Sequence, residues 1–127
     1  MAKILIVDDE PSLRELLKDY LELAGHSVET AETGMEGLTK LREGRFQLAT
    51  LDVDMPSMSG LDVLKLIRRD PKLAKLPVLM CTARDMMSSV DDAFDEGASG
   101  YIVKPFDFAT VGKSVAKALA GTAGPSR

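Results

Sequence analysis

The stretch Leu48-Ala49-Thr50-Leu51-Asp52-Val53-Asp54-Met55-Pro56 determines how this chain of 127 residues is expected to fold. Its first four residues are mostly apolar and suit a buried strand, and the proline shows that the chain soon turns into a loop. The strand therefore ends on the carboxylate of Asp52. In open sheets of parallel strands, ligands bind at the edge formed by the carboxyl ends of the strands. The stretch predicts a core strand that delivers an acid to a binding site.

Three further apolar runs end on polar or charged residues in the same way. They are residues 4–7, followed by Asp8 and Asp9, residues 78–81, followed by Thr82, and residues 101–103, followed by Lys104. If these runs are parallel strands of one sheet, their ends meet at one edge. Carboxylates, a hydroxyl and an ammonium group can together hold a divalent cation and a phosphoryl group.

Segments with helical periodicity alternate with the strands. Apolar residues recur at spacings of three and four near residues 12–24, 35–44, 61–70, 90–97 and 108–119. Short apolar strands that alternate with helices imply parallel pairing through right-handed crossovers, with helices on both faces of the sheet. The prediction is an α/β fold, a doubly wound five-stranded parallel sheet with five helices. Residues 1–120 are expected to form one domain and residues 121–127 a flexible tail. Periodicity alone leaves the strand order open.

Composition excludes several classes of function. The formal net charge is -4, and no clustered basic excess indicates direct nucleic-acid binding. The only cysteine, Cys81, allows no internal disulfide, fits a reducing compartment and suits a small core residue. No apolar run reaches the roughly 18 residues that a membrane span requires, and the N-terminus lacks a secretory signal. We therefore expect a cytoplasmic protein without membrane contact.

The acids at the predicted edge indicate a cation site. Asp8, Asp9 and Asp52 would lie close together, and like charges at short range are unfavourable unless a cation compensates them. Carboxylate oxygens with room for water suit Mg²⁺. A carboxylate beside such a cation can act as a nucleophile toward a phosphoryl group and form an acyl phosphate. Lys104 would then offer charge, and Thr82 a hydrogen bond, to the phosphoryl oxygens.

Four motifs, taken together, resemble the receiver domain of bacterial two-component response regulators, and the chemotaxis type of single-domain regulator in particular. They are Val7-Asp8-Asp9-Glu10, Asp52-Val53-Asp54-Met55-Pro56 followed by Gly60, Thr82-Ala83, and Tyr101-Ile102-Val103-Lys104-Pro105-Phe106. Each motif alone is weak, but their order and spacing are specific. The resemblance covers about residues 3–120. It implies a flavodoxin-like sheet with the strand order 2-1-3-4-5.

The resemblance also implies a role for each matching residue. Asp52 is expected to be the phosphoacceptor, and Mg²⁺ to be bound directly by Asp9, through water by Asp8, and by the backbone carbonyl of Asp54 and by Asp52. Lys104, placed before a cis Pro105, is expected to contact the phosphoryl group. Thr82 and Tyr101 are expected to form the switch pair.

The implied function is a phosphorylation-activated signalling switch, which catalyses only its own phosphorylation and dephosphorylation. The phosphoryl donor is expected to be a sensor histidine kinase or a phosphotransfer protein. A downstream protein is expected to bind the surface formed by the helix near residues 90–97, the strand at 101–103 and the last helix.

Three alternatives remain open from the residues. Asp52-Val53-Asp54 also resembles the nucleophile and acid/base pair of haloacid-dehalogenase phosphatases. That family places its second acidic cluster downstream, whereas here Asp8 and Asp9 lie upstream. A second alternative is a receiver-like scaffold that never takes phosphate, although none of the usual acids, threonine or lysine is lost. A third is a receiver domain cut from a larger multidomain regulator.

Two positions distinguish this chain from a generic receiver. In the family, the residues two after the phosphoacceptor and two after the switch threonine flank the path of the hydrolytic water. Here they are Asp54 and Arg84, of opposite charge. We hypothesise that the two form an exposed pair that obstructs the water and slows autodephosphorylation. Two other readings are that Arg84 contacts the phosphoryl oxygens and speeds its loss, and that both side chains are merely solvated.

A basic stretch follows the third predicted helix. It consists of Lys65, Arg68, Arg69, Lys72 and Lys75. Because cations are common near helix C-termini, we interpret the stretch as a solvated face.

Overall fold

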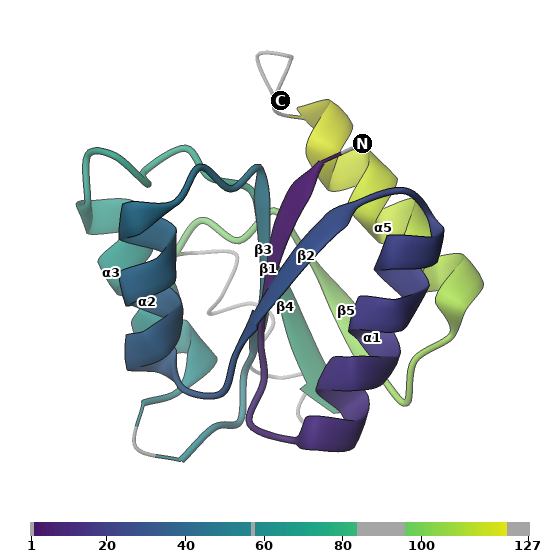
Figure 1. Ribbon diagram of the computed structural model, residues 1–127. Coiled ribbons are helices and arrows are strands. Elements are labelled where there is room, and N and C mark those ends of the chain that lie inside the picture. The colour runs from purple at the N-terminus through teal and green to yellow at the C-terminus, as the bar shows by residue number, and fades with distance from the viewer. Residues whose placement is uncertain (1, 57, 84–95, 122–127) are drawn as a thin grey trace.

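The computed structural model describes residues 2–56, 58–83 and 96–121, and within them it contains one five-stranded parallel sheet (Figure 1). The strand order is β2-β1-β3-β4-β5. The strands are β1 (Lys3–Val7), β2 (Ser27–Ala31), β3 (Leu48–Asp52), β4 (Val78–Ala83) and β5 (Gly100–Lys104), and the described helices are α1 (Pro11–Leu23), α2 (Gly34–Glu43), α3 (Gly60–Arg69) and α5 (Phe108–Gly121). The predicted α/β class, parallel pairing and strand order are confirmed.

One predicted helix cannot be compared with the structure. Residues 84–95, which carry most of the segment predicted as helical near 90–97, lie outside the described residues, and so does Arg84. Of that segment only Glu96 and Gly97 are described, and they form a turn. The predicted tail also lies outside the described residues, except for Gly121, which ends α5.

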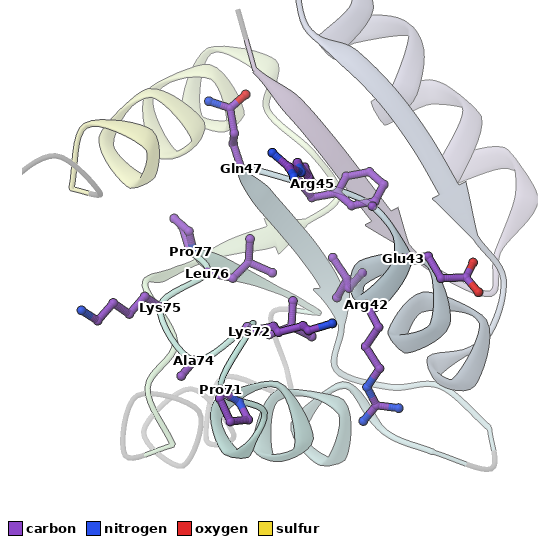
Figure 2. Close-up of a pocket in the computed structure, with 14 residues that line it drawn as sticks. Arg42, Glu43, Arg45, Gln47, Pro71, Lys72, Ala74, Lys75, Leu76 and Pro77 are labelled. Carbon is purple, nitrogen blue, oxygen red and sulfur yellow. The ribbon is translucent and has the colours of Figure 1, made fainter.

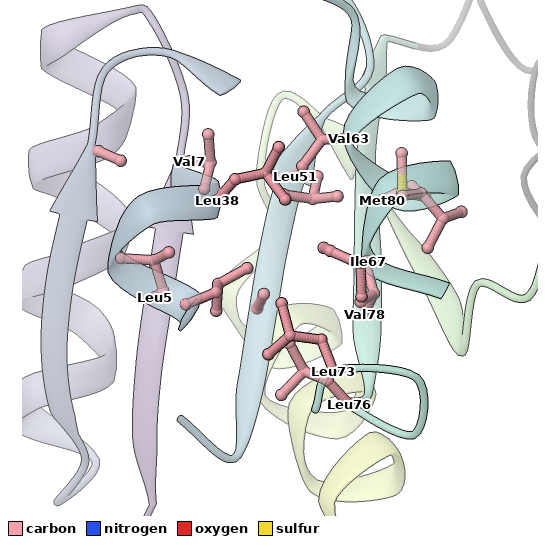
Figure 3. Packing of buried hydrophobic residues seen from close by; sticks show 14 of the residues in the cluster. Leu5, Val7, Leu38, Leu51, Val63, Ile67, Leu73, Leu76, Val78 and Met80 are labelled. Atoms are coloured by element: carbon pink, nitrogen blue, oxygen red, sulfur yellow. The ribbon is translucent and has the colours of Figure 1, made fainter. Parts of the chain in front are cut away.

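Helices cover both faces of the sheet (Figure 1), and each face is packed with its own cluster of buried hydrophobic residues. Helices α2 and α3 cover one face, where Leu38 and Ile67 pack against Leu51 and Val78 (Figure 3). Helices α1 and α5 cover the other face with a second set of buried side chains, which includes Cys81. Every residue of β3 is buried, as expected for a central strand covered on both faces. Burial raises the pKa of the Cys81 thiol to about 12, which agrees with the interpretation of this residue as part of the core.

Local signals fix where the helices start. Helix α1 begins at Pro11, whose missing N–H costs nothing in a first turn. The side chains of Thr33 and Ser59 accept hydrogen bonds from the backbone N–H groups of Glu36 and Asp62 and so cap α2 and α3. None of the helices in the described part of the chain is both long and apolar enough to cross a bilayer.

The interpretation of the basic stretch as a solvated face is wrong for one member, Arg68. Its guanidinium is partly buried and donates two hydrogen bonds, of 3.0 and 2.7 Å, to the carbonyl oxygen of Gly97. Its Nη1 also donates to the carbonyl oxygens of Leu73 at 3.5 Å and Ala74 at 3.3 Å. Burial lowers the pKa of Arg68. Arg68 therefore joins the end of α3, the loop after it and the turn before β5.

We expect Arg68→Ala to lower the free energy of unfolding by about 1–3 kcal/mol, because it leaves backbone carbonyls without their donors. Arg69→Ala is the matched control, since Arg69 is the neighbouring residue and is exposed. This control should change stability by less than about 0.5 kcal/mol. Urea unfolding of both variants checks the difference. Equal effects would show that the hydrogen bonds of Arg68 contribute nothing to stability.

Candidate functional site

The carboxyl ends of four strands meet at one edge of the sheet. Parallel register pairs Val7 with Leu51, Asp52 with Cys81, and Ala83 with Lys104. The chain then leaves each strand at the same level, so that Asp8 follows the end of β1 while Asp52 and Lys104 end β3 and β5. A cleft of about 490 Å³ lies there, lined by Asp9, Glu10, Pro11, Asp52, Asp54, Ala83 and Lys104. The predicted convergence of the strand ends is confirmed.

Lys104 lies between two buried acids. Its Nζ is 3.2 Å from Oδ2 of Asp8 and 3.3 Å from Oδ1 of Asp52. The side chains of these acids are only 5% and 6% exposed, against 16% for Lys104. Two carboxylates therefore share one ammonium group, and the three side chains together carry a net negative charge. The Lys104–Pro105 peptide bond is cis, as the resemblance implied.

This arrangement changes the proton affinity of the central acid. Burial and the charge of Asp8 raise the pKa of Asp52 to about 7, although Lys104 and the backbone N–H of Asp54 act in the opposite direction. The N–H of Asp54 lies 3.2 Å from Oδ1 of Asp52. For Lys104, burial disfavours the charged form, but the carboxylates of Asp52 and Asp8 outweigh it and raise its pKa. The site thus holds excess negative charge that an incoming cation can neutralise.

We expect Asp52→Asn to make the metal-free protein more stable by about 1–3 kcal/mol at neutral to alkaline pH, because it removes a buried charge next to Asp8. Between pH 3.8 and about 7, Asp52 of the wild type binds more protons in the folded state than in the unfolded state. Its contribution to stability is therefore fully present below that window and is lost as the pH rises through it. Urea unfolding in the presence of a chelator should show a gain that grows across this window. A gain independent of pH would contradict the assignment.

The acids also satisfy the requirements of a cation site. One oxygen from each of Asp8, Asp9 and Asp52 lies within 4.8 Å of the other two. Asp8 is already engaged, since its Oδ1 accepts the N–H of Glu10 at 2.9 Å. Asp9 is exposed, and its carboxylate has no hydrogen-bond or ion-pair partner among the described residues. Hard oxygen donors, one of them free and open to water, fit Mg²⁺.

The loop after β3 is held close to the acid. The N–H of Gly60 donates to the carbonyl of Val53 at 3.1 Å. A Cβ at Gly60 would lie 2.8 Å from the carbonyl carbon of Asp52 and closer still to its oxygen, so this position excludes any side chain. The side chain of Asp54 is exposed. Whether it reaches Arg84 stays a prediction, because Arg84 lies outside the described residues.

The two predicted switch residues lie on neighbouring strands. Thr82, in β4, is only 1% exposed, and its hydroxyl donates to the carbonyl of Ala83 at 3.2 Å. Tyr101, in β5, is 38% exposed and is paired in register with Met80. Tyr101 therefore lies outward in this structure, on the strand next to that of Thr82.

Arg14 is a site residue that the sequence analysis missed. Its Nη1 donates to the backbone carbonyl of Asp8 at 2.8 Å, and its Nη2 is 3.9 Å from Oε1 of Glu32. The guanidinium thus supports the turn that carries Asp8 and Asp9. Its place in the second turn of α1, one helical turn after Glu10, was the available signal, but side-chain direction cannot be read from spacing alone.

Comparison with known proteins agrees with this geometry. The family described as "Response regulator receiver domain" matches residues 4–116. The chemotaxis protein CheY-3 of Vibrio cholerae is 41% identical over 116 residues, which are 91% of this chain and 89% of that protein.

Solved structures of response regulators are also similar to this chain. The chemotaxis response regulator CheY4 of Vibrio cholerae is 36% identical with a TM-score of 0.87, covering 93% of this chain and 98% of that one. A putative response regulator from Chloroflexus aurantiacus is 33% identical with a TM-score of 0.90, covering 94% and 98%.

Proposed function

The chain belongs to the response regulator receiver family, and from this premise we propose that Asp52 is the residue that accepts the phosphoryl group. The observation that carries the proposal is the position of Lys104, whose ammonium group forms ion pairs with both Asp52, at the end of β3, and Asp8. Family membership favours the receiver reading over the haloacid-dehalogenase phosphatase. A receiver acts as a signalling switch and not as an enzyme with an external substrate.

The proposed reaction is a phosphoryl transfer from a histidine residue of a sensor kinase or a phosphotransfer protein. An oxygen of the Asp52 carboxylate attacks the phosphorus, and the bond between phosphorus and the imidazole nitrogen breaks. The electron pair of that bond returns to the imidazole, and Asp52 becomes an acyl phosphate. Lys104 then lies within reach of the phosphoryl oxygens, where its ammonium group stabilises their charge. The hydroxyl of Thr82, on the adjacent strand, supplies a hydrogen bond.

We propose that Asp9 and Asp52 bind Mg²⁺ directly, Asp8 through water, and Asp54 through its backbone carbonyl. The exposed carboxylate of Asp9, which has no partner among the residues that the structure describes, supports the direct assignment. The existing contacts of Asp8 with Lys104 and Glu10 support the water-mediated one. When bound, Mg²⁺ supplies positive charge that offsets repulsion between the acids and the incoming phosphoryl group. We further propose that residues 1–120 act as one domain in the cytoplasm.

Activation is proposed to be a shift between two populated states. The phosphoryl group adds charge at Asp52, Thr82 turns toward it, and Tyr101 moves inward from its exposed position. A modification shifts such an equilibrium only through its different interaction with the two states. The surface that changes for a downstream protein should therefore include β5 and α5, together with the predicted helix near residues 90–97.

Amide hydrogen exchange with and without BeF₃⁻, a phosphate mimic, tests this proposal. We expect exchange to slow in β5 and at the start of α5 when Mg²⁺ and BeF₃⁻ are both present. Asp52→Asn is the control, because it removes the carboxylate that the mimic binds. Changes confined to α1 and α2 would refute the proposed surface.

A further inference from the structure

A second hollow lies at the opposite end of the sheet from Asp52. It has a volume of about 800 Å³ and lies between residues 41–47, which are the end of α2 and the loop after it, and residues 71–77, which follow α3 (Figure 2). These segments lead directly into the amino ends of β3 and β4. Because β3 has five residues at about 3.3 Å each, this groove is roughly 16 Å from the acid site. An occupant of the groove would leave Asp52 accessible.

The lining of the groove is basic, although the chain as a whole has a net charge of -4. Four cations and one acid line it: Arg42, Arg45, Lys72, Lys75 and Glu43. Arg42 is paired with Asp70 at 3.1 Å. Among the described residues, the side chains of Arg45, Lys72 and Lys75 form no ion pair. The C-terminal dipole of α2 accounts for Arg42 in its last turn, but Arg45 and Lys75 lie beyond the helix ends.

The shape of the groove indicates an extended ligand. Figure 2 shows Arg45, Lys72 and Arg42 at separate places around it, so that their charges do not converge on one point. A compact anion such as phosphate would need converging donors. The apolar side chains that line the groove, here called its apolar floor, include Phe46, Leu73 and Leu76, which also pack against the core. The Nζ of Lys3 already lies 4.7 Å from the centre of the Phe46 ring, so that Leu73 and Leu76 are the part of this floor open to an apolar ligand group. Separated cations around an apolar floor are complementary to a peptide that carries several acids and one apolar side chain.

We propose that this groove binds an extended acidic segment of a partner protein, with one apolar residue seated over Leu73 and Leu76. The site is independent of phosphorylation, since it lies at the far end of the strands. A partner bound there would hold the domain both before and after Asp52 is modified. The surface is separate from β5 and α5, where the phosphorylation-dependent partner is proposed to bind.

The test uses short fluorescent peptides in which glutamates flank a single leucine, phenylalanine or tryptophan. Binding to the full chain is measured by anisotropy, and the bound residues by amide NMR shifts. We expect shifts confined to residues 41–47 and 71–77 and an affinity that falls with salt. The affinity for the peptide should be the same with and without BeF₃⁻ and the same in Asp52→Asn as in the wild type. Peptide binding can therefore succeed or fail independently of the proposal that Asp52 accepts phosphate.

Two double variants of equal charge make the test specific. Arg45→Gln with Lys72→Gln should weaken binding roughly tenfold. Lys113→Gln with Lys117→Gln removes two exposed cations of α5, outside the groove, and should leave it unchanged. Equal loss in both doubles, or no saturable binding by any peptide, would overturn the proposal. The proposal would also be overturned if pyrophosphate bound the same residues more tightly than the peptides do. It would likewise be overturned if the NMR shifts of these residues followed self-association of the chain.

Discussion

We expect Asp52→Asn to abolish phosphorylation, which is the largest effect predicted for any substitution in this chain. The chain is incubated with acetyl phosphate and Mg²⁺, and intact-protein mass spectrometry follows the addition of one phosphoryl group. The wild type should be labelled, because Asp52 is a buried acid that shares Lys104 with Asp8 and faces the cleft. The amide of asparagine cannot form an acyl phosphate. We expect labelling of the variant to fall to background.

The matched control for this experiment is Asp54→Asn. Asp54 lies two residues away and lines the same cleft, but its side chain is exposed. Its backbone N–H, which donates to Asp52, is unaffected by the substitution. Labelling should therefore persist in Asp54→Asn, with a change at most in the lifetime of the phosphate. Persistent labelling of Asp52→Asn, or its loss in the control alone, would show that another residue is the acceptor.

The second large effect concerns Mg²⁺. Asp9→Asn should weaken binding by at least about tenfold, since it removes the exposed carboxylate of the cluster. Asp8→Asn should weaken it less, because Asp8 is already bonded to Lys104 and Glu10, and its loss also relieves repulsion on Asp52. The chain contains no tryptophan, so that calorimetry or amide NMR shifts are the suitable measurements. A greater loss of Mg²⁺ affinity in Asp8→Asn than in Asp9→Asn would show that Asp8 is the direct ligand and Asp9 the water-mediated one.

The strands and their polar ends were predictable because each is coded locally. A run such as residues 48–51 is mostly apolar, and the acid or hydroxyl after it marks the end of the strand. Residue spacing alone did not give the strand order, which came from the resemblance to receivers. Spacing also could not show that Lys104 contacts both Asp8 and Asp52, because the three residues lie at the ends of three different strands, far apart in the sequence.

The residues that the sequence did not reveal act through side-chain direction. Arg68 was grouped with solvated cations because it lies among them, yet it turns inward to the carbonyl of Gly97, which has a φ of 97°. A cation that bonds backbone carbonyls leaves no partner of opposite charge to recognise in the sequence. For Arg14 the shorter contact is likewise with a backbone carbonyl, that of Asp8 at 2.8 Å, whereas its charged partner Glu32 lies 18 positions away in the sequence at 3.9 Å.

The ion pairs of Lys104 also bear on the order in which the chain is synthesised. The two acids belong to the first half of the chain, where Asp8 follows β1 and Asp52 ends β3, whereas the ammonium group that compensates them arrives with the last strand. A nascent chain that emerges from its N-terminus can pair β1 with β3 before β5 exists. In a chain at that stage Asp8 and Asp52 would lie close together without Lys104, so that docking of β5 would both complete the sheet and compensate the charge at its edge. Truncation before residue 104 should therefore destabilise the folded part by more than the lost apolar contacts alone.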